Sequence, residues 1–238
     1  MTVSTVNYRE IIEHKEANMK EWKMEGKPAL VLLHYQEGII GKGTWIQGWY
    51  EPAKKKCIES GMFEHTQELL AAFREKGLPV IFVNAIANPF GKLPAYGYLM
   101  DKNREHYSNE VMFDNEDLRA GLEVMPEMNR RPDEPVLYNW LLAGFTNSGL
   151  DAVLRSQGVE TIVLCGFALN SVVYHTAVQA GDLWYNTIIP SDTSAVYMPR
   201  KPGEKPDIDE IVTRVVLEEM APSLSLVTTA ADVIAHLQ

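Results

Sequence analysis

The sequence predicts an α/β domain in three layers, a doubly wound, Rossmann-like arrangement around a mainly parallel sheet of about six strands. Two observations lead to this prediction. Short apolar runs without alternation, which are typical of strands covered on both faces, recur along the chain. Helical patterns lie between these runs, and strand–helix alternation implies right-handed βαβ units. The length of 238 residues is compatible with a single α/β core.

Four runs rich in Val, Ile and Leu are the strongest strand candidates: residues 29–33, 80–83, 161–165 and 187–189. Two weaker candidates complete the predicted sheet: residues 135–138 and 223–228. Helical patterns fill four of the intervals: residues 62–76, 147–157, 172–180 and 208–220. The first of these helices places Leu69, Leu70 and Phe73 on one face and ends at Gly77, a typical C-terminal stop.

The domain is predicted to span residues 27–238, after an N-terminal helical extension formed by residues 1–26. Two stretches carry little regular pattern, residues 35–53 and residues 84–133. Loops of that length within a compact domain usually form lids or pocket walls, so we expect them to border the functional site.

Charge and composition exclude several classes of function. The net charge of −10 and the pI near 5.1 argue against nucleic acid, because phosphate binding needs a basic face. No secretory h-region and no apolar run of about 20 residues is present, so we expect a soluble, cytoplasmic protein without membrane contact. Cys57 and Cys165 fit no metal or redox spacing and are expected to be free thiols. The partner expected is a small molecule.

Ligands of doubly wound sheets bind outside the carboxyl ends of the strands. Three segments therefore qualify as site candidates: residues 34–36, 138–140 and 166–171. The third joins a buried strand to a helix, with Asn170 or Ser171 as the expected N-cap. Backbone N–H groups at such a helix start favour an anion or a polarised carbonyl oxygen, although both side chains could also act as caps alone.

Three segments resemble a known family in their order and spacing. They are residues 144–151 with Leu154, Arg155 and Gly158 after them, residues 161–170, and residues 192–195. Together they are similar to the isochorismatase and nicotinamidase superfamily of cysteine hydrolases. Residues 29–35 and 73–83 fit the family's first two strands and the intervening helix, so the resemblance runs from about Lys27 to the C-terminus. The resemblance implies an isochorismatase-like fold and an assembly of identical subunits, either a dimer or a tetramer.

The resemblance also implies where catalytic residues would lie. The family uses an Asp after its first strand, a Lys at the end of its third strand and a Cys at the start of the helix after its fourth strand. In register, these positions hold His34, Asn139 and Val172. Val172 has no nucleophilic atom, and the neighbouring Ser171 is rotated by about 100° along a helix. Cys165 belongs to the preceding buried strand, so we expect a triad-deficient protein without a thiol mechanism.

Backbone features of the family can outlast these substitutions. The family's oxyanion hole would correspond to the N–H groups of Ala168 and Val172, which bind substrate without any side chain. The resemblance also implies a non-proline cis peptide between Phe167 and Ala168.

His34 and Asn139 are the candidate catalytic residues. The ordinary pKa of histidine suits proton transfer near neutrality, although a core histidine bonded to the backbone is an equal alternative. Asn139 could orient a substrate through two hydrogen bonds or have a neutral structural role.

The candidate substrate-binding residues come from two segments. The first long loop would supply an aromatic wall formed by Trp45, Trp49 and Tyr50, and the turn after the fourth predicted strand would supply Ala168, Asn170, Ser171 and Val172. An aromatic wall suits a planar or cyclic ligand, whereas surface packing or a subunit contact is the alternative. Tyr138, Trp140 and His175 are weaker candidates.

Asn84 and Asn88 follow the second strand without a His-x-His or Asp-x-His spacing, so no metal and no cofactor are predicted.

Two functions remain open from the sequence. The first is a hydrolase of a small carbonyl- or carboxylate-bearing metabolite, of the amide or vinyl ether type, with non-covalent acid–base catalysis by His34. The second is an inactive binding or scaffold homologue that kept the fold. A third, weaker alternative is another reaction class built from other pocket residues, because fold does not determine function.

Overall fold

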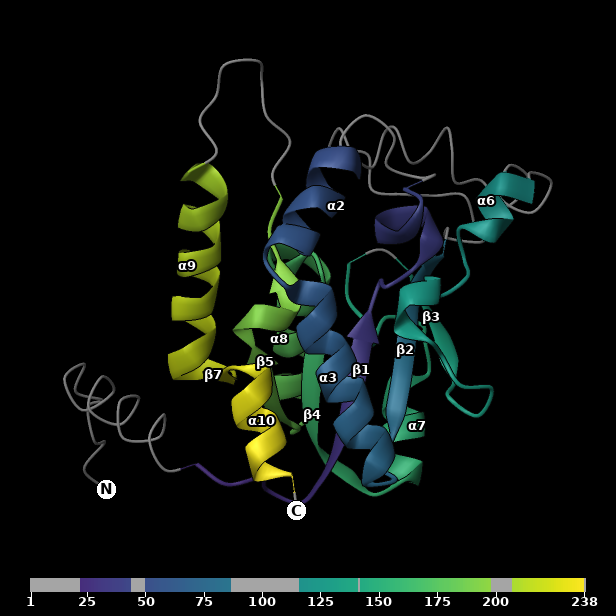
Figure 1. Ribbon diagram of the computed structural model, residues 1–238. Helices are drawn as coiled ribbons and strands as arrows, with labels where there is room; N and C mark the ends of the chain where they lie inside the picture. The colour runs from purple at the N-terminus through teal and green to yellow at the C-terminus, as the bar shows by residue number, and fades with distance from the viewer. Residues whose placement is uncertain (1–21, 44–49, 87–115, 141, 198–206, 238) are drawn as a thin grey trace, which may run out of the picture.

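A central parallel sheet divides the molecule into three layers (Figure 1). The computed structural model describes residues 22–43, 50–86, 116–140, 142–197 and 207–237. The strand order is β3-β2-β1-β4-β5-β7, and β6 pairs with the end of β4. Every pairing between these strands is parallel. The strands are β1 (Lys27–Leu33), β2 (Val80–Ile86), β3 (Val136–Trp140), β4 (Val159–Phe167), β5 (Asn186–Pro190), β6 (Ser194–Ala195) and β7 (Leu226–Thr228).

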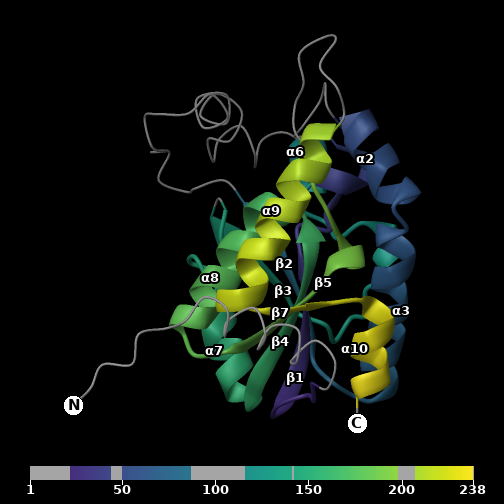
Figure 2. The same cartoon turned by 90° about the vertical axis from the view of Figure 1, so that its left-hand side faces the viewer.

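Helices cover both faces of this sheet, as the view along its edge shows (Figure 2). On one face lie α2 (Tyr50–Glu59), α3 (Met62–Glu75) and α10 (Ala230–His236). On the other lie α7 (Leu150–Ser156), α8 (Tyr174–Asp182) and α9 (Asp207–Ser223). Short helical turns complete the described elements: η1 (Glu37–Gly41), α6 (Glu116–Ala120), η2 (Pro126–Met128), η3 (Leu169–Val173) and η4 (Ser191–Thr193).

Strand β1 is at the centre of the core because successive side chains of a strand point to opposite faces. Leu30 and Leu32 pack toward α3, whereas Val31 and Leu33 pack toward α7 and α8. All four are fully buried. The run of consecutive apolar residues in β1 therefore reflects burial on both faces, as the sequence predicted.

The predicted α/β class and mainly parallel sheet are confirmed, and all six predicted strands and all four predicted helices are present. Gly77 follows α3 with a φ of 64°, the left-handed conformation of a helix stop. The two-residue strand β6 and the helices α2, α6 and α10 were not predicted from the sequence. Among the described residues, none of the helices has the length and apolar composition of a membrane span.

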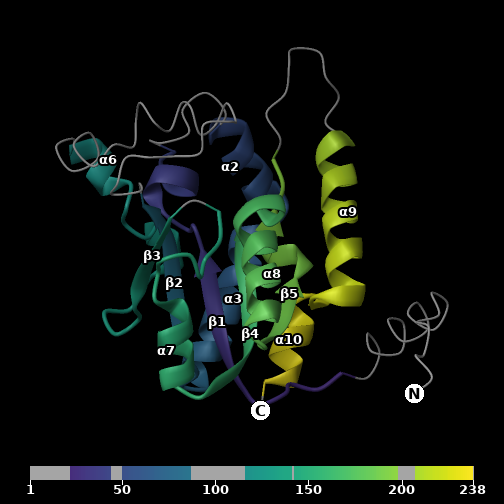
Figure 3. The same ribbon diagram turned by 180° about the vertical axis from the view of Figure 1, so that it is seen from behind.

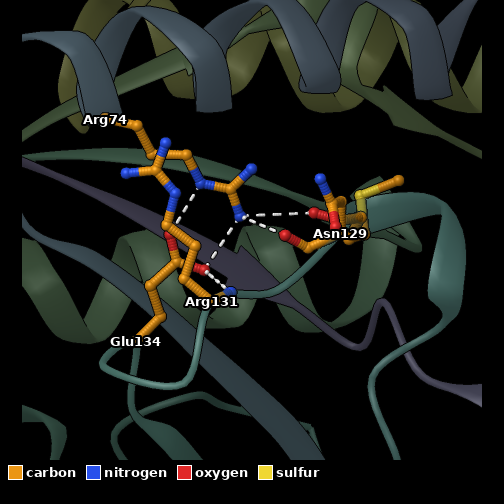
Figure 4. A network of polar contacts seen from close by, with 5 residues as sticks. Arg74, Asn129, Arg131 and Glu134 are labelled. Carbon is orange, nitrogen blue, oxygen red and sulfur yellow. Dashed lines mark hydrogen bonds and ion pairs between the residues drawn. The ribbon is translucent and has the colours of Figure 1, made fainter.

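A buried ion pair ties α3 to the segment that precedes β3 (Figure 4). Arg74 Nε donates to Glu134 Oε1 over 2.6 Å, and Arg74 Nη2 donates to Glu134 Oε2 over 2.8 Å. The second nitrogen also donates to the carbonyl of Asn129 over 3.0 Å, and the backbone N–H of Arg131 donates to Glu134 over 2.8 Å. The bidentate geometry and these extra bonds fix residues 129–134, which precede β3, against α3.

Most of the predicted N-terminal extension, residues 1–21, lies outside the described residues. The described part, residues 22–26, forms no helix. It is anchored by Trp22, whose indole N–H donates to Asp232 over 2.7 Å and whose ring stacks on His236 at 4.1 Å. This segment therefore runs against α10 before entering β1.

Candidate active site

The candidate site lies where the strand order reverses, between the carboxyl ends of β1 and β4. The chain leaves β1 toward β2 and β3 on one side, while β4 and β5 lie on the other, as the rear view shows (Figure 3). His34 follows β1 directly, and the turn that starts at Ala168 follows β4. Gly166 allows the two ends to approach, since a Cβ there would lie 2.6 Å from the carbonyl oxygen of Leu33.

His34 turns the chain out of β1 with a φ of 60°, in the left-handed region. Its backbone N–H donates to the carbonyl of Val83 on β2 over 2.8 Å, and its side chain is buried. Beyond it, Gln36 fixes the chain: its Oε1 accepts from the N–H of Ala85 over 2.6 Å, and its Nε2 donates to the carbonyl of Gly121 over 2.9 Å. The backbone that presents His34 is therefore braced on both sides.

The structure brings the two candidate catalytic residues together. His34 Nε2 lies 2.9 Å from Asn139 Oδ1, although β2 separates β1 from β3 in the sheet. Asn139 is fully buried, and its Nδ2 donates to the carbonyl of Ala143 over 3.1 Å. Because that bond turns Oδ1 toward the imidazole and Oδ1 can only accept, Nε2 of His34 carries the proton. Nδ1 then holds the lone pair.

Burial determines the charge of this imidazole. It lowers the pKa of His34 from 6.5 to about 4, against a smaller opposing effect of the hydrogen bond with Asn139. His34 therefore does not keep the ordinary histidine pKa on which its candidacy for proton transfer was based, because desolvation disfavours the charged form. At neutral pH the ring is uncharged. Its Nδ1 can therefore accept a proton, but it carries no proton that it could give to a substrate.

The turn after β4 has the predicted backbone. The peptide between Phe167 and Ala168 is cis, which confirms the expectation taken from the resemblance. Residues of η3 then form a wide helical turn, closed by a bond from the N–H of Val173 to the carbonyl of Ala168 over 3.4 Å. Val172 is the residue before Val173, so its N–H lies within this turn. The side chain of Val172 is fully buried in the apolar core on the α8 side of the sheet.

The predicted helix capping is wrong. Neither Asn170 nor Ser171 occupies an N-cap position: Ala168 precedes η3 and Val173 precedes α8, without a side-chain cap bond at either place. The two predicted cap residues lie inside the wide turn, half-buried. The carbonyl of Ser171 accepts a hydrogen bond from Nδ1 of His175 over 2.7 Å, which places that histidine along α8.

Of the three aromatic residues predicted for the substrate wall, the structure describes Tyr50. Tyr50 is half-buried on α2, and its hydroxyl donates to the carbonyl of Gly41 in η1. Lys54 donates to the same carbonyl over 2.5 Å and lies 5.6 Å from the Tyr50 ring centroid. Tyr50 thus links α2 to η1. Trp45 and Trp49 lie outside the described residues.

Both cysteines are packing residues. Cys57 and Cys165 are fully buried free thiols, and burial raises the pKa of each to about 12. At neutral pH neither forms a thiolate, and the absence of a thiol mechanism stays a prediction. Among the described residues, no group of three or more His, Cys, Asp or Glu side chains could hold a metal ion. Asn84 is buried and donates to the carbonyl of Leu122 over 2.8 Å, whereas Asn88 lies outside the described residues.

Gly144 and Thr176 were not predicted as site residues from the sequence. The N–H of Gly144 donates to Thr176 Oγ1 over 2.8 Å, and Thr176 Oγ1 donates to the carbonyl of Val172 over 2.5 Å. Thr176 follows Val172 by four residues, a spacing that places two side chains on one helix face. That spacing was the available signal in the sequence.

Comparisons with known proteins identify the family. A family model described as the isochorismatase domain matches residues 28–231. The chain therefore belongs to the isochorismatase family. A related protein is YwoC of Bacillus subtilis, an uncharacterized isochorismatase family protein, which is 27% identical over 171 residues that cover 72% of this chain and 79% of that protein. The ureidoacrylate amidohydrolase RutB of Pseudomonas syringae pv. syringae is 27% identical over 182 residues, 71% of each chain.

Solved structures show the same fold. A cysteine hydrolase from Pseudomonas syringae pv. phaseolicola superposes with a TM-score of 0.69 at 22% identity, over 91% of this chain and 95% of that chain. The N-carbamoylsarcosine amidase from Thermoplasma acidophilum superposes with a TM-score of 0.59 at 24% identity, over 86% of this chain and 96% of that chain. The isochorismatase-like α/β fold predicted from the sequence is confirmed.

Proposed function

We propose that this isochorismatase-family chain hydrolyses a small carbonyl-bearing metabolite of the amide type by non-covalent acid–base catalysis. The observation that carries the proposal is the hydrogen bond from Nε2 of His34 to Asn139. It leaves a neutral imidazole with its lone pair on Nδ1, at the edge of the sheet where ligands of this fold class bind. A neutral imidazole held in this tautomer can accept a proton from water through Nδ1.

The reaction then needs no covalent intermediate. Nδ1 of His34 takes a proton from a water molecule as its oxygen adds to the substrate carbonyl carbon. The N–H groups of Ala168 and Val172, the positions of the family's oxyanion hole, would hold the negative oxygen. The imidazolium returns its proton to the leaving nitrogen as the carbon–nitrogen bond breaks. The products are a carboxylic acid and an amine, which balances the water consumed.

The low pKa of His34 favours an amide over a vinyl ether. Hydrolysis of a vinyl ether begins with protonation of a carbon, which requires a proton donor in the resting state. Burial lowers the pKa of His34 to about 4, so the resting ring at neutral pH has no proton on Nδ1. The names of two similar proteins, a ureidoacrylate amidohydrolase and an N-carbamoylsarcosine amidase, also describe amide hydrolysis and support this substrate class.

One observation favours the alternative, a binding homologue without activity. Val172 fills the position of the family's nucleophile with methyl groups, fully buried in the core. A site that keeps the carbonyl-binding turn and lacks the nucleophile could bind a carboxylate or carbonyl group without cleaving it. The same polar groups would then fix ligand orientation only.

A mass-spectrometric turnover screen separates the two functions. The purified protein is incubated with ureido acids, N-carbamoyl amino acids and simple primary amides, beside His34→Ala and, as a control, His65→Ala, which replaces a half-exposed histidine of α3. We expect conversion by the native protein and the control and its loss in His34→Ala. If no compound is converted while ureido acids raise the melting temperature, the binding homologue is the correct function.

A further inference from the structure

Five hydrogen bonds form a continuous line from His34 to the turn after β4. The line starts with Nε2 of His34, which donates to Asn139 Oδ1 over 2.9 Å. Nδ2 of Asn139 then donates to the carbonyl of Ala143 over 3.1 Å. The amide group of one side chain thus links the imidazole to the loop that follows β3.

The peptide group between Ala143 and Gly144 is the next link. Its carbonyl accepts from Asn139, and its N–H, on Gly144, donates to Thr176 Oγ1 over 2.8 Å. Because a peptide group is planar and stiff, fixing the N–H at one end fixes the direction of the carbonyl at the other. The orientation of the Asn139 side chain therefore depends on the partner of Gly144.

Thr176 connects this loop to the carbonyl-binding turn. Its hydroxyl is fully buried, accepts from Gly144 and donates to the carbonyl of Val172 over 2.5 Å. The peptide group that holds this carbonyl also holds the N–H of Val173, which donates to the carbonyl of Ala168 over 3.4 Å. Every bond in the line is donated in the same direction, from His34 toward Ala168, and such chains polarise one another.

Packing makes the link from Gly144 to Thr176 specific. A Cβ at position 144 would lie 3.0 Å from Leu33 Cδ2 and 3.0 Å from Thr176 Oγ1. The loop reaches the hydroxyl because residue 144 has no side chain. A hydroxyl is required at position 176, because a single group must accept from one side and donate to the other.

We propose that Thr176 is a positioning residue for the site, which acts through Gly144 and Asn139 to keep the proton of His34 on Nε2. The inference rests on the proposed function for its catalytic meaning. If the hydroxyl is removed, the Ala143–Gly144 peptide loses its restraint. Asn139 can then rotate and present Nδ2 to the imidazole, which moves the proton to Nδ1 and removes the lone pair that would accept a proton from water.

Nitrogen-15 NMR of the imidazole ring tests the proposal without a substrate. The native protein and Thr176→Ser, which keeps the hydroxyl, should show a single Nε2–H tautomer for His34 at pH 7. Thr176→Val, which keeps the shape, should show both tautomers and shifted side-chain amide signals for Asn139. A valine variant that keeps the single native tautomer, or a serine variant that loses it, overturns the proposal.

A second measurement covers a valine variant that does not fold. In the native protein, hydrogen exchange of the Gly144 amide should be slower than in an unstructured chain by at least about 100-fold. Smaller protection overturns the proposed link. Both readouts are independent of turnover, so an inactive protein with a single Nε2–H tautomer would contradict only the proposed function. His34-dependent turnover with an unaltered valine spectrum would contradict only the role of Thr176.

Discussion

Asn139 Oδ1 accepts a hydrogen bond from His34 Nε2 over 2.9 Å, although 105 residues separate the two in sequence. The parallel order β3-β2-β1 places the carboxyl ends of their strands at the same edge of the sheet. These are the positions at which the family resemblance places an acid and a lysine. In this chain the two positions hold a neutral hydrogen-bonded pair.

Because His34 is neutral in the folded protein, the free energy of unfolding should depend on pH. The pKa of His34 is about 4 when folded and 6.5 when the chain is unfolded, so the unfolded state binds more protons between these values. Stability is full above pH 6.5 and should fall by on the order of 3 kcal/mol as the pH drops to 4. Urea unfolding from pH 7 to pH 4 measures this loss. His34→Gln should flatten the dependence in that range; equal slopes in the native protein and this variant would contradict the assignment.

A carboxylate at position 139 should reverse the effect of burial on His34. In Asn139→Asp, a negative charge beside the imidazole favours its protonated form and should raise its pKa by about 1–3 pH units. An NMR titration of the ring measures the change. Asn186→Asp is the matched control, because it adds the same charge at an exposed residue where β5 begins. If both variants shift His34 equally, the hydrogen bond to residue 139 does not control its charge.

Chemical labelling tests the role of the two thiols. Because burial raises the pKa of Cys57 and Cys165 to about 12, iodoacetamide at pH 7.5 should modify neither in the folded protein and both in denaturant. Mass spectrometry of the intact protein counts the added groups. Rapid labelling of Cys165 in the folded protein, with loss of turnover, would indicate a thiol mechanism after all.

Removing one member of the ion pair between Arg74 and Glu134 should destabilise the fold strongly. The pair is nine-tenths buried, so Glu134→Gln leaves an uncompensated guanidinium and should cost about 3–5 kcal/mol. Chemical denaturation measures the loss. Glu59→Gln removes the exposed partner of Lys55 and should change stability by less than about 0.5 kcal/mol. Comparable losses in the two variants would show that burial does not govern the contribution of the pair.

The sequence predicts most of the fold because continuous apolar runs for strands, and apolar residues at helical spacing, are local signals. The four Val- and Ile-rich runs became β1, β2, β4 and β5, in parallel order. The helix α10 was not predicted, although Thr229 accepts from the N–H of Asp232 over 3.2 Å in a capping arrangement that its sequence contains.

The sequence could predict only those parts of the candidate site that lie at the ends of predicted strands. His34 and Asn139 each lie at the carboxyl end of a predicted strand, so their proximity follows from topology. The tautomer and the charge of His34 do not follow from topology. The tautomer depends on the backbone carbonyl of Ala143, which orients Asn139, and the charge depends on the degree of burial. No residue type encodes either quantity. The catalytic roles of the two residues stay predictions, as do the expected assembly of identical subunits and the expected absence of metal and cofactor.

The pH dependence of turnover, measured on the substrate that the native protein converts fastest, tests the central claim most directly. If neutral His34 accepts the proton from water, kcat/KM should stay level from pH 7 down to about pH 5 and fall with an apparent pKa near 4. The intact mass of the protein during turnover should show no acyl adduct. An acid limb near pH 6.5, an adduct, or an unchanged profile in His34→Ala would contradict the account.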